Sequence, residues 1–534
     1  MKRTLRILLY SQAMLNILVT EDLPPEALAL LDAPDIHYDN LRPSRAELRD
    51  CIGGYEGLIV RWMTRVDADL LERAPRLRVI GRAGASLDNI DLDAATRRGV
   101  IVTNTPLMHS TASAEYTLGL LLALVRHIPQ AHNAVQSGQW ATRRQYIGTE
   151  LSGKTLGLIG FGKVGREVAA RAQAFGLEVI AYDPYIEESD TRGTGVMLVD
   201  LDELLERADF VSLHTPLTDE TKNLIGAGEF AQMKTGALLV NTARGALVNE
   251  AALAEALKSG KLAGAAVDTF TREPPDGSPL LGLPNAITTP HLGASTHEAL
   301  RGVAIQLVQQ ALDALRGADY RNVVNLPFIG GADFRALRPQ LTLAEKIGSL
   351  QRQLAAAPVK RVEVETRGEL ANLIKPLTIA LLKGLLGDQA NYINAPTVAA
   401  EQGVTVSQAK GLPLVGYPNL LSCRVSWQGG ARLIAGTLFA DEEARIVQMD
   451  DFRLDGLPVG TVLVMSNDDV PGVIGRVGTL LGVRGINIAE WRLGRDKRGG
   501  RALSFINLDN GVPETVLAEL RAVPGIAEAR VVEL

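Results

Sequence analysis

Three polar side chains in the middle of the chain have the types and the spacing that a proton-transfer site needs. Arg244 follows the apolar run ALLVN, Glu273 follows GAAVDTF, and His291 follows AITTP. A histidine titrates near neutrality, a carboxylate on its other ring nitrogen fixes the tautomer, and an arginine clamps a carboxylate. These three residues therefore predict acid/base chemistry on the hydroxyl group of a small acid.

A glycine-rich turn lies upstream of these residues. Gly160, Gly162 and Gly165 follow an apolar run and precede a helical stretch, which is the setting in which G-x-G-x-x-G binds a pyrophosphate. The first N–H groups of that helix, at Lys163 and Val164, would point at the phosphates with the positive end of the helix dipole. The turn predicts a dinucleotide site.

The next apolar run ends at Asp183, 23 residues after Gly160 (183 − 160). A carboxylate at this position accepts hydrogen bonds from ribose hydroxyls and repels a 2′-phosphate. Its neighbours Tyr182 and Pro184 supply no arginine for such a phosphate. The sequence therefore predicts NAD rather than NADP, and we expect no metal.

Strands that alternate with short helices would position these groups. The alternation occupies the N-terminal hundred residues, and after residue 152 it restarts with six apolar runs that end near His291. The carboxyl ends of parallel strands open into one crevice, so Asp268 and the acid/base residues would meet there. The tail changes to a mixed pattern and ends in strand, helix, strand, strand, helix, strand. We expect an α/β fold with two doubly wound parallel sheets, then an α+β domain and a βαββαβ module.

Composition excludes several classes of protein. The 534 residues carry a net charge of −6, which argues against a nucleic-acid partner, and the basic segment 492–501 contains two glycines typical of a solvated hairpin. The apolar run 116–125 is about half the length that a bilayer requires, so we expect no membrane association. Two cysteines form no disulfide framework, which favours the cytoplasm.

The motifs LIGFGKVGREVA, NTARGALVNEAAL, TFTREPP and TPHLGAST resemble those of the D-2-hydroxyacid dehydrogenases. The resemblance implies that Arg244 holds the substrate carboxylate and that Glu273 pairs with His291 as the acid/base. It implies that a helix near 295–317 rejoins the N-terminal domain. The implied cofactor contacts are Thr215, Pro216, Thr242, Ala243, Gly293 and Asp268, which would face the nicotinamide amide. The expected domains are a substrate domain (1–111 with 292–322), an NAD domain (112–291), an intervening domain (323–456) and an ACT domain (457–534).

The N-terminal segments and the tail resemble the long-form phosphoglycerate dehydrogenases within that family. The resemblance implies oxidation of D-3-phosphoglycerate to 3-phosphohydroxypyruvate, the first step of L-serine biosynthesis. Several arginines are physically sensible for a phosphorylated hydroxy acid. The implied substrate residues are Arg61, Arg82, Gly84, Ala85 and His109.

The C-terminal module resembles an ACT domain, which binds amino acids. In related domains the positions of Asn467, Asp469 and Asn487 bind serine across a dimer interface, so L-serine is the expected effector and a homo-oligomer, a dimer or a tetramer, is expected. Asp469 precedes Pro471-Gly472 and has an alternative interpretation as the cap of the following helix.

Two alternative functions remain open. The first is another D-2-hydroxyacid dehydrogenase, such as a hydroxypyruvate, glyoxylate or 2-oxoglutarate reductase; the two N-terminal arginines and the long tail count against it. The second is an amino-acid-responsive regulator that only binds NAD; the Arg-Glu-His set counts against it. Four substrate-side residues depart from the family pattern and leave the breadth of substrates open: Trp62, Met63, Ser86 and His109.

Overall fold

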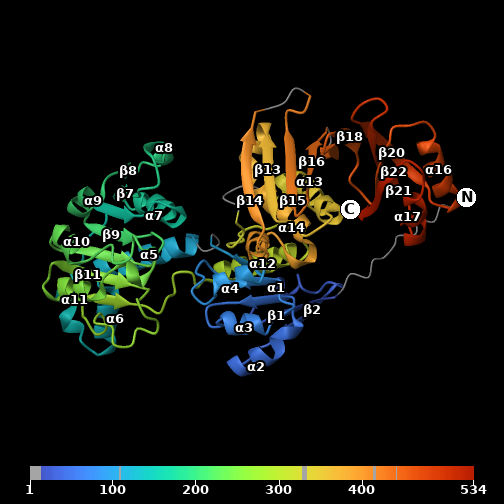
Figure 1. Cartoon of the computed structure of the whole chain (residues 1–534). Coiled ribbons are helices and arrows are strands. Elements are labelled where there is room, and N and C mark those ends of the chain that lie inside the picture. The colour runs from blue at the N-terminus through green and yellow to red at the C-terminus, as the bar shows by residue number, and fades with distance from the viewer. Residues whose placement is uncertain (1–13, 107–109, 328–333, 413–415, 440–441) are drawn as a thin grey trace, which may run out of the picture. The chain divides into compact units, whose positions relative to one another are not determined.

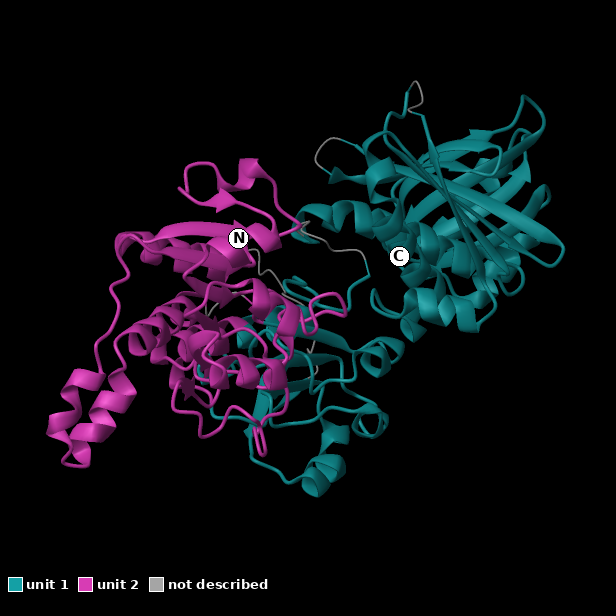
Figure 2. Cartoon of the chain, turned by 90° about the vertical axis from the view of Figure 1, so that its left-hand side faces the viewer, with its two compact units in different colours: residues 1–22, 28–104, 307–534 teal, residues 23–27, 105–306 magenta. Residues whose placement is uncertain are grey.

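The structure is a computed structural model that describes residues 14–106, 110–327, 334–412, 416–439 and 442–534. Within these residues four β-sheets carry the helices (Figure 1). They form two compact units (Figure 2). The first unit holds the described residues up to Asp22, Leu28–Asn104 and those from Leu307 onward, and the second holds Leu23–Ala27 and those of Thr105–Gln306. The predicted fold class is confirmed.

The first parallel sheet has the strand order β2-β1-β3-β4-β5. Three of its strands consist wholly of buried residues, as expected for a parallel sheet that is covered on both faces. The edge strand β2 has no apolar run and was not predicted. The strands are β1 Leu15–Val19, β2 Ile36–Asn40, β3 Gly57–Val60, β4 Val79–Arg82 and β5 Ile101–Asn104, and the helices are α1 Pro25–Leu28, α2 Arg45–Cys51, α3 Ala68–Glu72 and α4 Leu92–Arg97.

The second half of α12 (His297–Leu315) packs on this sheet. A Cβ on Gly57 would lie 3.2 Å from the Leu315 side chain, and a Cβ on Gly81 would lie 3.3 Å from Leu307. Because both strand positions are glycine, the helix approaches the strands closely. The predicted return of the chain to the N-terminal domain is therefore confirmed.

The second parallel sheet has the order β12-β11-β10-β9-β6-β7-β8. Successive strands are added on one side of β6 up to β8 and on its other side from β9 onward, so the topological switch point lies between β6 and β9. Open parallel sheets bind ligands at the carboxyl edge beside such a switch point. The six predicted strands are present, and the two-residue β8 adds a seventh. The strands are β6 Thr155–Ile159, β7 Glu178–Tyr182, β8 Met197–Leu198, β9 Phe210–Leu213, β10 Ala237–Asn241, β11 Leu262–Val267 and β12 Ala286–Thr288. The helices are α5 Ser110–Val125, α6 Ile128–Gln136, α7 Lys163–Ala174, α8 Glu188–Thr191, α9 Leu201–Arg207, α10 Ala227–Gln232 and α11 Glu250–Lys258.

The tail contains a mixed sheet, β14-β13-β15-β16-β17-β18, and an antiparallel sheet, β20-β21-β19-β22, that forms the predicted βαββαβ module. The basic segment 492–501 is a hairpin between β20 and β21, as predicted. The helices are α13 Phe334–Leu354, α14 Ile374–Leu386, α15 Ala395–Glu401, α16 Val473–Val483 and α17 Glu514–Arg521. The strands are β13 Arg361–Arg367, β14 Thr405–Gly411, β15 Leu420–Trp427, β16 Gly430–Leu438, β17 Ala444–Met449, β18 Phe452–Gly456, β19 Thr461–Asp468, β20 Ile488–Arg495, β21 Arg501–Leu508 and β22 Ile526–Glu533.

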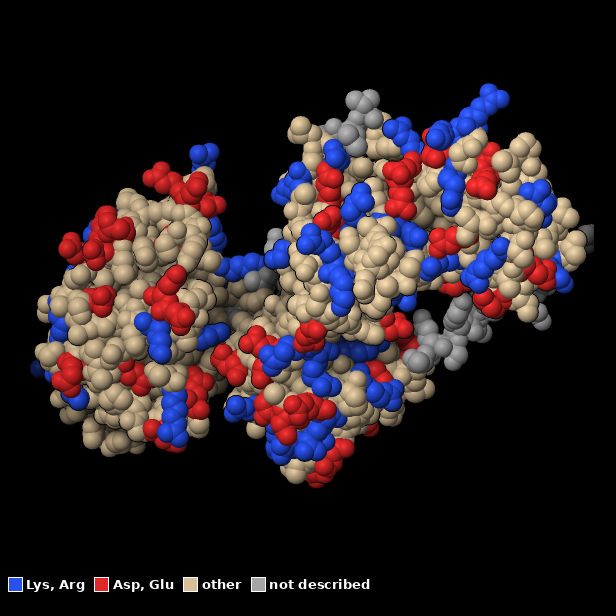
Figure 3. Space-filling view, in the orientation of Figure 1, with Lys and Arg blue, Asp and Glu red and all other residues tan. Residues whose placement is uncertain are grey.

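The surface carries both signs of charge, and basic and acidic side chains are interspersed on the face that Figure 3 shows. Among the described residues one helical stretch, Gly368–Gln389, has the length and composition to cross a bilayer. Half of its most apolar window is buried inside the protein, as is common for a core helix.

Candidate active site

The predicted acid/base pair lies at the carboxyl edge of the seven-stranded sheet. His291 Nδ1 lies 2.9 Å from Glu273 Oε2 and 3.1 Å from Oε1. Both side chains are about half exposed, 49% for the histidine and 40% for the glutamate. Since an ionised carboxylate only accepts, Nδ1 carries a proton in this pair and Nε2 is the ring nitrogen that remains for proton exchange.

Asp268 holds the loop that carries His291. The His291 N–H donates to the Asp268 carbonyl oxygen (2.9 Å). The buried Asp268 carboxylate accepts from the Thr289 hydroxyl (2.6 Å) and from the N–H groups of Leu292 (2.9 Å) and Gly293 (2.8 Å). His291 has a φ of 55°, which is uncommon outside glycine, so the loop depends on such bonds. The contact of Asp268 with the nicotinamide amide stays a prediction.

The surroundings of Glu273 keep its carboxyl group ionised. Partial burial raises its pKa, but hydrogen bonds from His291 and from the Phe270 N–H and the nearby charge of Arg244 outweigh burial, so the pKa lies below its ordinary value. The Phe270 N–H donates to Oε1 at 3.1 Å. The carboxylate is therefore fixed by one backbone bond and remains negative beside the histidine.

The loop after β10 places Arg244 beside this pair. The Asn241 side chain donates to the Arg244 carbonyl oxygen (2.8 Å) and accepts from the Ala243 N–H (3.1 Å). A Cβ on Gly245 would overlap the Phe270 backbone, so only glycine lets this loop lie against the strand end that leads to Glu273. One guanidinium nitrogen donates to the Ala243 carbonyl (2.7 Å), and the guanidinium makes no other hydrogen bond to any residue that the structure describes.

The glycine turn between β6 and α7 has the geometry of a dinucleotide site. Gly160 has a φ of 97°, and a Cβ there would lie 2.7 Å from the His214 carbonyl carbon. A Cβ on Gly165 would overlap the Gly160 carbonyl oxygen, whereas Gly162 has open space at its Cβ position. The first and third glycines are thus required by the fold and the second leaves room for a ligand. The predicted contacts Lys163 and Val164 are the first two residues of α7.

Asp183 closes the turn from the end of β7. Its Oδ2 accepts from the Phe161 N–H (3.0 Å) and its Oδ1 from the Tyr185 N–H (3.1 Å), which leaves further lone pairs for ribose hydroxyls. After β9, the Thr215 hydroxyl oxygen is buried and has no hydrogen-bond partner within the described part of the chain. A buried hydroxyl without a partner is costly, so this group suits a polar ligand. These residues fit NAD.

Thr242 has a structural bond in addition to its predicted cofactor contact. The Thr117 hydroxyl donates to the Ser113 carbonyl oxygen (2.8 Å) and lies 2.8 Å from the Thr242 hydroxyl. Thr242 is therefore the donor of that pair and offers a ligand only its acceptor sites. Ala243 is part of the turn that orients Arg244, and Pro216 is exposed at the neighbouring strand end.

The predicted substrate residues of the first unit lie at the carboxyl edge of the five-stranded sheet. Arg61 follows β3 and Arg82 ends β4. Arg82 is buried, and a Cβ on Gly84 would overlap its guanidinium, so the glycine leaves room for that group. Asn104, at the end of β5, donates to the Ala85 carbonyl oxygen (2.8 Å). The structure brings Arg82, Gly84 and Ala85 together in one loop.

Departures from the family pattern surround that loop. Trp62 and Met63 follow Arg61 and are 68% and 71% exposed. The Ser86 hydroxyl donates to the Asp88 carboxylate (2.7 Å) and accepts from the Asp88 N–H (3.2 Å), so its extra atoms are used within the turn. His109 lies outside the described residues.

The predicted effector residues lie at the strand ends of the βαββαβ module. Asn467 is buried, and its Oδ1 has no hydrogen-bond partner among the described residues. The alternative role of Asp469 as a helix cap is wrong, because Gly472 occupies the cap position of α16 and no side chain caps that helix. Asp469 instead accepts from the Gly499 N–H (3.0 Å) in the basic hairpin. Asn487 donates to a neighbouring aspartate.

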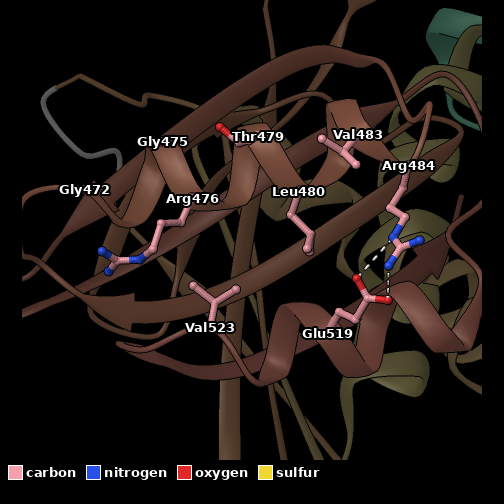
Figure 4. Close-up of a pocket in the computed structure, with 9 residues that line it drawn as sticks. All are labelled: Gly472, Gly475, Arg476, Thr479, Leu480, Val483, Arg484, Glu519 and Val523. Atoms are coloured by element: carbon pink, nitrogen blue, oxygen red, sulfur yellow. Dashed lines mark hydrogen bonds and ion pairs between the residues drawn. The ribbon is translucent and has the colours of Figure 1, made fainter.

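A groove of about 630 Å³ runs between α16 and α17 of the same module (Figure 4). An ion pair crosses it, with Arg484 Nη2 2.6 Å from Glu519 Oε1. None of the three predicted effector residues lines this groove. In the described part of the chain no cluster of three or more His, Cys, Asp or Glu side chains is arranged to hold a metal ion.

Sequence reasoning missed several residues that hold the sites. Phe270 holds Glu273 through a backbone N–H and therefore gives no signal in the sequence. Thr289 lies inside the TTPH motif, where a hydroxyl two residues before a histidine was a usable signal. Asn89 contacts the loops of both predicted substrate arginines, and only its place after the glycine of the GASLDN motif pointed to it.

Known families match successive parts of the chain. Residues 118–293 match the NAD binding domain of the D-isomer specific 2-hydroxyacid dehydrogenases. Residues 336–450 match the D-3-phosphoglycerate dehydrogenase intervening domain, and residues 461–525 match the ACT domain.

Relatives align with nearly the whole chain. A D-3-phosphoglycerate dehydrogenase of Archaeoglobus fulgidus is 41% identical over 529 residues, which cover 97% of this chain and 100% of the relative. One of Bacillus subtilis is 38% identical over 526 residues, which cover 98% and 100%. The crystal structure of a Thermus thermophilus protein aligns with a TM-score of 0.54 at 40% identity, over 58% of this chain and all of that one. This chain therefore belongs to the D-isomer specific 2-hydroxyacid dehydrogenases, and it is an NAD-dependent enzyme of the group that carries a phosphoglycerate dehydrogenase intervening domain and an ACT domain.

Proposed function

We propose that this enzyme oxidises D-3-phosphoglycerate to 3-phosphohydroxypyruvate, the first step of L-serine biosynthesis. The observation that carries the proposal is the His291–Glu273 pair beside Arg244, whose guanidinium has open donors, at the sheet edge that also holds the glycine turn. The names of the full-length relatives support the choice of substrate.

The residues divide the reaction among them. The glycine turn and Asp183 would hold NAD, which would supply the hydride acceptor for the substrate's C2 atom. His291 Nε2 takes the hydroxyl proton, and Glu273 holds Nδ1 so that the imidazolium is stabilised and correctly turned. Arg244 binds the substrate carboxylate through its open N–H donors. Arg61 and Arg82 bind the phosphate, which has the charge and oxygen atoms for more than one arginine.

The test of the substrate is a comparison of kcat/KM on D-3-phosphoglycerate with D-glycerate and D-lactate, all with NAD. We expect phosphoglycerate to exceed the unphosphorylated acids by at least about a hundredfold, as two charge-assisted contacts are lost without the phosphate. Equal or better values on the small acids would instead assign another D-2-hydroxyacid dehydrogenase, and NAD binding without turnover of any acid would assign a regulator.

We propose that the ACT domain binds L-serine through Asn467, Asp469 and Asn487. The buried Asn467 Oδ1 without a partner supports the proposal, since a ligand ammonium would satisfy it. Calorimetry with L-serine on the full-length enzyme, with D-serine as the control, tests it, and equal heats for both enantiomers would contradict it. We further propose that the enzyme is a homo-oligomer, a dimer or a tetramer, and that it is located in the cytoplasm. Sedimentation velocity would measure the number of subunits.

We also retain the four predicted domains, with limits at residues 111, 291, 322 and 456, as a proposal. The matches to the intervening and ACT families fall inside the last two domains and support those limits. Limited proteolysis tests the limit at 456, where cleavage is expected in the linker that precedes β19.

A further inference from the structure

Asn89 joins two loops at the carboxyl edge of the five-stranded sheet. Its side-chain nitrogen donates to the carbonyl oxygens of Arg61 and Thr64, 2.7 Å away in each case. Its side-chain oxygen accepts from Arg82 Nε at 3.3 Å. One half-buried amide thus contacts the residue that follows β3 and the guanidinium that ends β4.

The chemistry of the amide is matched to these partners. Two carbonyl oxygens require a group with two hydrogens, and an arginine N–H requires an acceptor on the same side chain. Asparagine supplies both, whereas aspartate supplies only the acceptor and serine is too short to reach three atoms. Asn89 is therefore the residue type that links both loops at once.

Apart from their contacts with Asn89, the two arginines are held in different ways. The Arg82 guanidinium is buried against Gly84, so its position is limited by packing. Arg61 is partly exposed, and the side chains of Trp62 and Met63 after it lie in solvent. Asn89 therefore holds the Arg61 loop together with two contacts from the residues after β1: the Thr20–Thr64 hydroxyl pair (3.0 Å) and the Glu21 carboxylate, which accepts from the Arg61 backbone. Removal of the amide would loosen the arginine on β3 more than the one on β4.

We infer that Asn89 is a positioning residue for the anionic end of the substrate: it sets the distance between Arg61 and Arg82 so that both bind one phosphate group. The inference rests on the proposed function, because it takes these two arginines as the phosphate ligands. Asn89 itself need not touch the substrate. Its effect is on substrate affinity, while the proton transfer at His291 in the other unit keeps its own geometry.

A purely structural role for Asn89 makes a different prediction. The backbone of the turn is held independently, because the Val66 N–H donates to the Asn89 carbonyl oxygen (2.8 Å) and Val66 bridges to Ile90. Loss of the side chain should therefore leave the domain folded. A structural amide would change stability and leave the KM for each substrate alike.

Asn325 provides a matched control in the same compact unit, beside the same five-stranded sheet. Its side chain also makes three hydrogen bonds, accepting from the Val102 N–H (3.0 Å) and donating to Val100 O (2.8 Å) and Thr96 Oγ1 (3.2 Å). It contacts no predicted substrate residue. Asn325→Ala should lower the melting temperature at least as much as Asn89→Ala without a change in KM.

The experiment compares wild type, Asn89→Ala, Asn89→Asp and Asn325→Ala in the full-length enzyme. For Asn89→Ala we expect the KM for D-3-phosphoglycerate to rise about tenfold, with kcat changed less than about threefold and KM for D-glycerate unchanged. Asn89→Asp keeps the acceptor for Arg82 but opposes two carbonyl oxygens, so an equal or larger rise is expected. NADH affinity, measured by fluorescence titration, should be the same in all four proteins.

A double-mutant cycle with Arg61→Ala completes the test. If Asn89 acts through Arg61, Asn89→Ala should raise KM less than about threefold in the Arg61→Ala background, since coupled residues are not additive. Additive effects, or equal rises of KM for D-3-phosphoglycerate and D-glycerate, would overturn the inference. A wild-type enzyme that does not prefer the phosphorylated acid would instead overturn the proposed function, so the two failures are distinguishable.

Discussion

The two parallel sheets are built alike but hold their functional groups in different ways. At the edge of the seven-stranded sheet, backbone bonds, Gly245 and the buried Asp268 carboxylate fix the acid/base pair. At the edge of the five-stranded sheet, one side-chain amide joins the two arginine loops. Proton transfer depends on distance more steeply than anion binding does. Changes at the first edge should therefore lower kcat, and changes at the second should raise KM.

The largest effect is expected from His291→Ala, which removes the acid/base and keeps the loop. We expect kcat to fall about a thousandfold or more, because a positioned general base contributes factors of this size. NADH affinity, measured by fluorescence titration, should stay within about threefold, since the glycine turn and Asp183 are untouched. Turnover near the wild-type value would rule out this histidine as the base.

Glu273→Gln tests whether the His291–Glu273 pair acts as a unit. We expect kcat to fall about a hundredfold with KM little changed, because a neutral amide does not fix the histidine tautomer or stabilise the imidazolium.

The same carboxyl group should make stability depend on pH, and the direction of that dependence can be worked out. The folded pKa of this carboxyl lies below its ordinary value, so its contribution to stability is present above the ordinary value and is lost as pH falls through the folded value. Urea unfolding at falling pH should show that loss in wild type and not in the variant. Identical curves would mean that the pair adds nothing to stability.

The catalytic edge could be predicted from the sequence because strand topology alone brings its residues together. Three successive strands of a parallel sheet end just before Arg244, Glu273 and His291. The length of an apolar run in the sequence is enough to locate the end of such a buried strand. The glycine turn could be predicted as well, because Gly160 has a positive φ and Gly165 lies close to the Gly160 carbonyl oxygen, so both positions require glycine.

The remaining features depend on tertiary contacts that leave little trace in the sequence. The strand β2 has no apolar run, and β8 has only two residues, so neither is marked clearly before its neighbours are in place. Asp469 has the spacing of a cap, but the turn at Pro471-Gly472 directs it to the hairpin at Gly499 instead. Asn89 joins loops that only the assembled sheet brings within reach.

Gly245→Ala tests whether backbone contact fixes the catalytic edge. A Cβ at this position overlaps the Phe270 backbone, so the loop of Arg244 and the strand end that leads to Glu273 must separate. We expect kcat to fall about tenfold and the free energy of unfolding to fall by about 1–3 kcal/mol, as for an overpacked site. Gly228→Ala in α10 is the control, because open space surrounds its Cβ position and alanine favours a helix. An unchanged kcat in Gly245→Ala would show that the two loops move independently.

The last prediction concerns stability rather than kcat. His214 lies against Gly160 of the dinucleotide turn, and its Nε2 is 2.9 Å from the Ser212 hydroxyl. Burial lowers the pKa of this histidine to about 4. In the unfolded chain a histidine binds its proton near pH 6.5, so between about pH 6.5 and pH 4 the unfolded state holds a proton that the folded state lacks. Stability is therefore lost as pH falls through this range, by at most about 3 kcal/mol.

His214→Asn keeps a polar partner for Ser212 but does not titrate, so urea midpoints of the variant and of wild type should converge as pH falls. His132→Asn, at an exposed position of α6 away from the dinucleotide turn, is the matched control substitution. A constant difference between His214→Asn and wild type would mean that water reaches this histidine in the folded enzyme. The edge of the seven-stranded sheet would then be as accessible to water as the edge of the five-stranded sheet. Its rigidity would have to come from backbone hydrogen bonds alone.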